Sequence, residues 1–199
     1  MTDLTTINSK RDIGAELAFL ELVGRLKHIK RTGWIKRNVP ECETIAGHMY
    51  RMAMTTFLLY DSHNINRLRC MELSLVHDLC ECIVGDITPF CGISREEKRS
   101  REDAAMQRIS ELTGFAGHYL MELYNEYENQ STEESKFVKD LDRFDMIQQA
   151  FEYEKQQTSP GKLQEFFDST DGKFYHPFIK SLVAELYKQR NIFMKAQSI

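Results

Sequence analysis

Apolar residues recur at steps of three and four along most of the chain, which is the spacing of one face of an α-helix. The first such stretch lies near 12–28, where Ile13, Leu17 and Leu20 mark the apolar face. No segment alternates apolar and polar residues over the length of a strand. The pattern therefore predicts an all-α fold, a single globular helical bundle, with further helices near 45–61, 66–82, 132–156 and 177–195.

Charge and capping residues add to this picture. Residues 94–113 alternate acidic and basic side chains, which is typical of a solvated helix face. Glutamates accumulate in a stretch without Lys or Arg and predict an acidic outer helix near 115–129. Ser159-Pro160 supplies an N-cap residue and a proline at the first position of a further helix, and His176-Pro177 is expected to open the helix near 177–195.

Composition bounds the class of protein. A chain of 199 residues with 42% apolar and 28% charged residues is most simply one domain over 1–199, with its core at about 12–195 and short flexible termini. A net charge of −4 argues against general nucleic-acid binding. We expect no membrane segment and no secretory signal, because no apolar run is long enough. Five cysteines without a repeated spacing fit reduced thiols in the cytoplasm, the nucleus not excluded.

The pair His77-Asp78 stands out within the helix predicted near 66–82. Its neighbours are apolar and should be buried, and they are Leu75, Val76 and Leu79. Polar groups in such a place must be hydrogen-bonded or bound to a metal, because leaving them unpaired costs several kcal/mol. A single buried histidine is more often an ordinary core residue, so the pair acquires meaning only together with other ligands.

Two more residues supply those ligands. His48 stands near the start of one predicted helix, and Asp142 lies on the helix predicted at 132–156. Helical bundles build metal sites from side chains on separate helices. Two imidazoles and two carboxylates suit Mn, Fe, Co, Zn or Mg rather than metals that prefer thiolates. We therefore predict a divalent-cation site formed by His48, His77, Asp78 and Asp142, with no organic cofactor.

Two carboxylates follow the pair closely. Glu81 is four residues after His77 and shares its helix face, and Asp86 follows the end of that helix. These carboxylates could orient a metal-bound water, act as general base or acid, or bind a second cation. The alternative is that Glu81 does not bind a cation itself and only holds His77 in position.

A basic segment between 25 and 37 contains the only tryptophan of the chain. A guanidinium binds phosphate through its planar fork, and an indole can stack on a base or sugar. We expect Arg31, Trp34 and Arg37 to contact substrate. For the other basic residues of the segment, a solvated helix end is the better interpretation.

These residues together resemble the HD-domain phosphohydrolases, whose signature is H…HD…D across a helical core. More narrowly, the chain is similar to the HD-domain 5'-deoxynucleotidase family of the HD domain-containing protein 2 type. The matching stretches extend from about 20 to 190 and include the segments 31–34, 37–39, 48–53, 77–87, 137–142, 168–170 and 172–177.

The resemblance implies a phosphoric monoester hydrolase. The expected reaction converts deoxyribonucleoside 5'-monophosphates to deoxyribonucleoside and phosphate, with a divalent cation and in a homodimer. It implies that Glu81, Asp86 and the backbone of Ile87 match positions that can hold a second cation. It also places Asp86 near the 2' carbon of the sugar and assigns Arg31 and Trp34 to a turn that contacts phosphate and nucleotide. Asp140 lies on another helix face and is not assigned as a ligand.

One position departs from the family pattern. The residue before His48 is Gly47, where the family usually has an acidic side chain that completes a capping box with a residue such as Thr44. Glycine also loosens a first helical turn by roughly 1 kcal/mol. We expect weaker order here in the metal-free protein but an intact site.

Two other functions remain as alternatives. The same metal core could hydrolyse another phosphate ester, although a small domain leaves little room for additional substrate-binding modules. A non-catalytic nucleotide-binding scaffold could also keep the fold. It would have little reason to retain all four predicted ligands together with Glu81 and Asp86.

Overall fold

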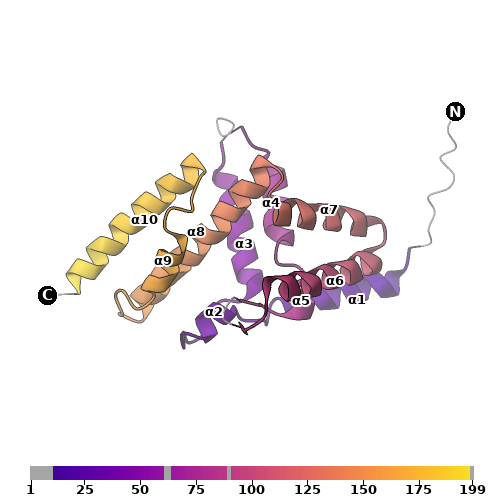
Figure 1. Cartoon of the computed structure of the whole chain (residues 1–199), viewed down its shortest axis with the longest axis horizontal. Helices are drawn as coiled ribbons and strands as arrows, with labels where there is room; N and C mark the ends of the chain where they lie inside the picture. Colours follow the sequence, from indigo (N-terminus) through magenta and orange to yellow (C-terminus); the bar gives the residue numbers. More distant parts are fainter. Residues whose placement is uncertain (1–10, 61–63, 89–90, 198–199) are drawn as a thin grey trace. The chain divides into compact units, whose positions relative to one another are not determined.

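The computed structural model describes residues 11–60, 64–88 and 91–197. These residues form helices joined by turns and loops (Figure 1), with one isolated β-bridge between Lys30 and Thr44 and no strand. The all-α prediction is therefore confirmed. The predicted flexible termini fall on 1–10 and 198–199, which lie outside the described residues.

The chain divides into two compact units, each made of two separate stretches. The first unit combines 1–46 with 76–125. Within it, α1 packs against both α5 and α6, and α5 packs against α6. Its helices are α1 (Ile13–Arg25), α2 (Thr32–Ile35), α5 (Glu81–Val84), α6 (Arg95–Thr113) and the larger part of α7 (Phe115–Asn129).

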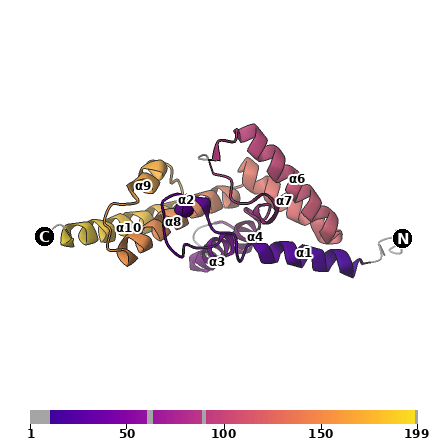
Figure 2. The same cartoon turned by 90° about the horizontal axis from the view of Figure 1, so that it is seen from below.

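The second unit combines 47–75 with 126–199. Its long helix α8 packs against α9 and α10, and α8 and α10 run side by side (Figure 1 and Figure 2). Thr132 and Ser135 form a capping box that starts α8. The elements of this unit are most of α3 (Ile45–Thr55), η1 (Thr56–Leu58), most of α4 (Arg67–Val76), α8 (Glu133–Gln156), α9 (Gln164–Thr170) and α10 (Pro177–Ala196). That the two units together make one domain over 1–199 stays a prediction.

Three predicted helix boundaries are wrong. The helix expected to reach 82 ends at Val76, because tighter backbone bonds follow, from Leu79 N to Val76 O and from Glu81 N to Asp78 O. The helix expected to reach 61 is an α-helix only as far as Thr55, and a short 3₁₀ helix follows at Thr56–Leu58. The pair Ser159-Pro160 opens no helix, because Gly161 follows with φ 75° and α9 starts only at Gln164.

The exposed side of α1 is the apolar face that the sequence predicted to be inside. The buried side chain of this helix is Leu22 instead, whereas Leu26, which also follows the predicted spacing, is buried directly after the helix. On the third predicted helix, Leu75 is likewise exposed although Val76 and Leu79 are buried. Helical spacing alone cannot decide which face of a helix is buried, and the exposed large apolar side chains on α1 are Ile13, Leu17 and Leu20.

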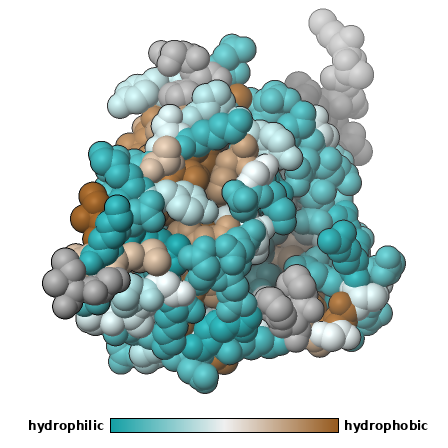
Figure 3. Space-filling view, turned by 60° about the vertical axis from the view of Figure 1, so that its left-hand side comes forward, coloured by the Kyte–Doolittle hydropathy of each residue, from teal (hydrophilic) through white to brown (hydrophobic). Residues whose placement is uncertain are grey.

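The helix α7 is less of an outer helix than its glutamates indicated. Leu123, Tyr124 and Tyr127 are buried, and the Tyr124 hydroxyl donates to Asp103 Oδ1 at 3.0 Å. On the face of the molecule in Figure 3, hydrophilic side chains cover most of the area and hydrophobic ones show in separate places. All five cysteines are free thiols, as expected. Among the described residues, no helix has the length and apolar character needed to cross a bilayer.

A buried ion pair joins α8 to α10. Arg190 donates through Nε to Glu154 Oε2 at 2.8 Å and through Nη2 to Oε1 at 2.9 Å, and both side chains are almost fully buried. Replacing Arg190 by Ala would leave a buried carboxylate without its countercharge. We expect Arg190→Ala to lower the free energy of unfolding by about 3–5 kcal/mol, measured by urea denaturation.

The matched control for this variant is Lys188→Ala, because Lys188 pairs with Glu185 at the surface of the same helix. An exposed pair contributes only about 0–1 kcal/mol. Equal losses in the two variants would contradict the structural role given to Arg190.

Candidate functional site

The first unit contributes the His77-Asp78 pair. Both residues lie in the turn between α4 and α5 rather than on a continuous helix. The His77 ring is buried, and its Nε2 lies 3.2 Å from Asp78 Oδ2. A ring nitrogen and a carboxylate oxygen, both donor types that divalent cations such as Mn, Fe, Co and Zn accept, therefore lie close together.

Glu81 stands directly beside this pair. It is the first residue of α5, its backbone N–H bonds to Asp78 O at 3.1 Å, and its side chain is buried. Burial, followed by the charges of Asp78 and Asp86, holds the pKa of Glu81 well above its usual range, although Arg31 and Lys98 oppose the shift. A carboxylate with a raised proton affinity beside the pair is suited to accept a proton from water.

Asp86 connects the carboxylates to the start of α2. Its Oδ2 accepts a hydrogen bond from Thr32 N at 2.6 Å, and its backbone carbonyl accepts one from Thr32 Oγ1 at 2.8 Å. Burial raises the pKa of Asp86, while the Arg31 charge and the Thr32 N–H counteract this. The loop after α5 is therefore fixed against the turn that carries Arg31.

The three predicted substrate contacts have different surroundings. Arg31 is the N-cap residue of α2, with Nε 3.9 Å from Glu43 Oε1, and its charge reaches Glu81 and Asp86. Trp34 is 1% exposed and its indole N–H donates to the same Glu43 oxygen at 2.9 Å. The indole therefore packs inside and positions Glu43, and this arrangement does not offer its face to a base. Arg37 lies half-buried in the turn after α2.

Lys98 is a functional candidate that the sequence did not indicate, because it stands in the run of alternating charges on α6. Its Nζ donates to the Ile87 carbonyl at 2.8 Å and lies 3.4 Å from Glu102 Oε1. Burial lowers the pKa of Lys98, but the charges of Glu102, Glu81 and Asp78 outweigh it and raise that pKa above its ordinary value. A charged ammonium therefore stands among the carboxylates of the first unit.

The second unit contributes His48 and Asp142. His48 lies in the first turn of α3 and is fully buried, and Asp142 lies on α8. The His48 Nε2 is 3.3 Å from Asp142 Oδ1. This unit, like the first, therefore brings a ring nitrogen and a carboxylate oxygen close together.

The other nitrogen of His48 is held by Asp145. Nδ1 lies 2.7 Å from Asp145 Oδ2, a hydrogen bond in which the ring N–H donates. Arg51 in turn donates to Asp145 Oδ1 at 2.5 Å and to Glu152 Oε2 at 2.9 Å. Burial alone would raise the pKa of Asp145, but the bonds and charges of His48 and Arg51 lower it. Histidines that ligate metals usually have such a carboxylate, which fixes the tautomer and leaves Nε2 for the cation.

Asp142 is held in a similar way. Its Oδ2 accepts hydrogen bonds from the Tyr127 hydroxyl at 3.0 Å and from Lys139 Nζ at 3.2 Å. These contacts engage one carboxylate oxygen and leave Oδ1 turned toward His48. No pattern of residues pointed to Tyr127, whereas Asp145 is recognisable as the carboxylate three residues after Asp142.

Asp140, which the sequence analysis did not assign as a ligand, has a different task. Its buried Oδ2 accepts from the backbone N–H groups of Tyr175 and His176 at 2.6 and 2.7 Å. His176 is the N-cap residue of α10. Asp140 therefore holds the start of α10. This contact gives a structural role to the matching segment 172–177, which contains both N–H donors.

The start of α3 is anchored by backbone bonds although Gly47 has no side chain to complete a capping box. The first two N–H groups of α3 donate to backbone carbonyls, from Ile45 N to Ile29 O at 3.0 Å and from Ala46 N to Leu26 O at 3.1 Å. These bonds satisfy two of the N–H groups that a helix start leaves without intrahelical partners. The expected weaker order of this turn without metal stays a prediction.

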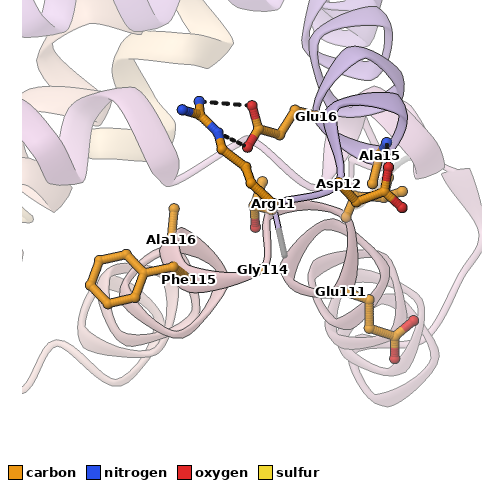
Figure 4. A pocket seen from close by; sticks show the side chains of 10 residues that line it. Arg11, Asp12, Ala15, Glu16, Glu111, Gly114, Phe115 and Ala116 are labelled. Atoms are coloured by element: carbon orange, nitrogen blue, oxygen red, sulfur yellow. Dashed lines mark hydrogen bonds and ion pairs between the residues drawn. The ribbon is translucent and has the colours of Figure 1, made fainter. Parts of the chain in front are cut away.

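A cavity of about 680 Å³ in the first unit is a poor candidate for the site. It lies between the start of α1 and the junction of α6 with α7, and Figure 4 shows Arg11 paired with Glu16 along its wall. None of the predicted site residues lines it. The pairs His77-Asp78 and His48-Asp142, by contrast, offer nitrogen and oxygen donors that fit a divalent cation such as Mn, Mg, Fe, Co or Zn.

Known proteins match this chain over most of its length. A family model described as HD domain matches residues 23–180. A Mus musculus protein named 5'-deoxynucleotidase HDDC2 is 51% identical over 183 residues, which cover 92% of this chain and 92% of that protein. The Homo sapiens protein of the same name is 51% identical over 176 residues, 88% of this chain and 86% of its own length. The solved structure of the HD domain-containing protein YGK1 superposes with a TM-score of 0.70 at 29% identity, covering 94% of this chain and 91% of that one.

Proposed function

Because this chain belongs to the HD-domain family, we propose that it is a metal-dependent 5'-deoxynucleotidase. It hydrolyses deoxyribonucleoside 5'-monophosphates to deoxyribonucleoside and phosphate, the activity that the names of its relatives state. One observation carries the proposal. Each unit brings the Nε2 of a signature histidine to within 3.3 Å of a signature aspartate oxygen, in His77-Asp78 and in His48-Asp142.

We propose that these four residues hold one divalent cation. The bound cation would supply a water of lowered pKa and would polarise a phosphate oxygen. The donor set does not choose among Mn, Co, Mg, Fe and Zn. The homodimer, the cytoplasmic location and the absence of an organic cofactor stay predictions from the resemblance and the composition.

The residues of the first unit then have distinct tasks. Glu81 receives the proton of the attacking water, because its buried carboxylate lies beside Asp78. Arg31 neutralises the phosphate, and Asp86 reads the sugar near its 2' carbon. Attack in line with the departing 5'-oxygen requires mainly positioning and charge stabilisation, since the charge is spread over several oxygens. Arg37 remains a proposed phosphate contact, and the buried Trp34 acts by holding Glu43.

Phosphate release from a panel of substrates tests this function. The protein, stripped of metal and reloaded with Mn²⁺ or Co²⁺, is given dAMP, dCMP and dTMP beside AMP, CMP, dATP and a phosphodiester. We expect release from the deoxyribonucleoside monophosphates and much less from the others. Preferred hydrolysis of a triphosphate or diester would favour another phosphohydrolase, and nucleotide binding without release would favour a scaffold.

Asp145 provides a prediction on cation affinity. Its replacement by Ala removes the acceptor that holds His48 Nδ1, so the ring loses its fixed tautomer and orientation. We expect Asp145→Ala to weaken Mn²⁺ binding by about 10–100-fold. The dissociation constant is measured by competition with a fluorescent chelator, with circular dichroism to confirm folding.

Asp140→Asn is the matched control for this experiment. Asp140 is a buried aspartate of the same helix, but its contacts go to the start of α10. The control should lower thermal stability and leave Mn²⁺ affinity unchanged. Unchanged affinity in Asp145→Ala, or an equal loss in both variants, would exclude a specific role for Asp145.

A further inference from the structure

A second cavity lies at the start of α10, entirely within the second unit. It has a volume of about 470 Å³ and is lined by one face of α8 and by the loop that leads into α10. Its loop residues belong to the segment 172–177, which matches the family and to which the proposed function gives no chemical task. Sites for small molecules usually have about 300–1,000 Å³. The cavity is therefore large enough for a small organic molecule.

Arg143 brings a fixed positive charge to the wall of this cavity. Its Nη1 donates to Asp140 Oδ1 at 3.3 Å and to the Lys173 carbonyl at 3.2 Å, and its side chain is 25% exposed. Both bonds use the same nitrogen, so Nε and Nη2 make no hydrogen bond to any residue that the structure describes. A guanidinium binds phosphate or carboxylate through two parallel N–H donors. Arg143 is therefore oriented by the protein and keeps one edge of its fork for an anion.

The carboxylates of the cavity wall are already neutralised. Asp140 is 1% exposed, and its oxygens accept from two backbone N–H groups and from Arg143. Glu133 pairs with Lys136 at 2.7 Å on the surface of α8. Such an exposed pair is weak, so the Lys136 ammonium can also turn toward a ligand. An anion that enters the cavity thus meets cationic donors, whereas the acidic side chains of the wall have their partners.

Tyr175 adds an accessible aromatic ring beside these cations. Its side chain lies on the cavity wall and the residue is 72% exposed, while its backbone N–H is held by Asp140 at 2.6 Å. The next ring, His176, packs with its edge toward Phe137 at 4.9 Å between ring centroids. Aromatic side chains stack on flat rings, and a neighbouring guanidinium binds an anionic group. This combination favours a flat molecule that carries a negative charge.

We propose that this cavity is a second ligand site, which binds a small molecule consisting of an aromatic ring and a phosphate or carboxylate group. The free edge of the Arg143 guanidinium binds the anionic group, and the Tyr175 ring stacks on the ring of the ligand. The inference does not rest on the proposed function, because none of the four proposed metal ligands lines this cavity.

Titration of the ¹⁵N-labelled full chain with phenylphosphonate, in buffer containing Mg²⁺, tests the proposal. Binding is followed by the NMR signals of the Tyr175 and His176 amides and of Arg143 Nε. We expect saturable shifts, and weaker binding of methylphosphonate, which lacks the ring. Saturation with benzoate instead would identify the anionic group as a carboxylate. No saturable shift with either aryl compound, or shifts confined to residues around His48 and His77, would overturn the proposal.

Two variants assign the parts of the site. Arg143→Gln removes the charged fork and should weaken the binding of phenylphosphonate about tenfold or more. Tyr175→Ala keeps the backbone N–H that Asp140 holds, so it preserves the start of α10. It should reduce the affinity for phenylphosphonate to that for methylphosphonate. Wild-type affinity in either folded variant would contradict the proposal, and Tyr175→Ala alone decides if Arg143→Gln does not fold.

Lys188→Gln is the matched control for the loss of charge. Lys188 pairs with Glu185 on the exposed surface of α10 and does not line the cavity. The control removes the same charge as Arg143→Gln and should leave the affinity for phenylphosphonate unchanged. An equal loss in both variants would mean that net charge alone attracts the anion, and it would overturn the assignment of the site.

Discussion

His77→Ala should abolish phosphate release from dAMP, dCMP and dTMP at any concentration of Mn²⁺ or Co²⁺. The variant removes a ring nitrogen that lies 3.2 Å from Asp78, and with it a proposed ligand of the cation. A bound cation contributes several kcal/mol to stabilising the transition state, so its loss is expected to cost about 10³-fold or more in rate. Initial rates of phosphate release measure the effect.

His118→Ala is the control for this variant, because His118 is an exposed histidine on α7. It should retain full activity and stability. Turnover near the wild-type value in a folded His77→Ala protein would refute the assignment of the metal centre.

Glu81→Gln should lower kcat by about 10²–10⁴-fold, which is the usual contribution of a general base. The amide keeps the shape of the buried side chain but cannot accept the proton of the attacking water. KM and the affinity for the first cation should change little, because Glu81 is not among the four proposed ligands. Steady-state kinetics and a Mn²⁺ titration of the same preparation separate these quantities.

Glu97→Gln provides the comparison, since Glu97 forms an exposed pair with Arg101 on α6. It should leave all three parameters unchanged. A loss of Mn²⁺ binding in Glu81→Gln as large as its loss of kcat would make Glu81 a ligand rather than a base.

The sequence was sufficient for the fold class and for most helices because these depend on local spacing. It failed where one helix could present either of two faces, as at Ile13, Leu17 and Leu20. It also failed where glycine with positive φ prevents a helix, as at Gly161. These failures share a cause, since burial is decided by packing partners that lie far away in the sequence.

The same distinction applies to the candidate site, where some residues were recognisable from their sequence neighbours and others were not. His77-Asp78 and Glu81 were recognisable because they are close in the sequence and stand in an apolar context. The residues that hold the ligands were not recognisable, because Arg51 and Tyr127 reach α8 from distant parts of the chain. Lys98 looked like a member of a solvated charge pattern, and only its contact with the Ile87 carbonyl distinguishes it.

Trp34 shows the limit of reasoning from residue type alone. An indole in a basic turn suggested stacking on a nucleotide, but the ring is buried and its N–H is bonded to Glu43. Arg31 keeps its proposed role because its charge reaches Glu81 and Asp86. A single aromatic residue is therefore weaker evidence for a binding site than a charge that acts on the carboxylates.

The proposed cation site consists of the four signature residues His48, His77, Asp78 and Asp142. It is tested most directly by the Mn²⁺ content of the wild type, His48→Ala and His77→Ala after equilibrium dialysis at a fixed, low free concentration. One bound ion per chain is expected in the wild type, and its loss is expected in both variants. Full occupancy in either folded variant would contradict it.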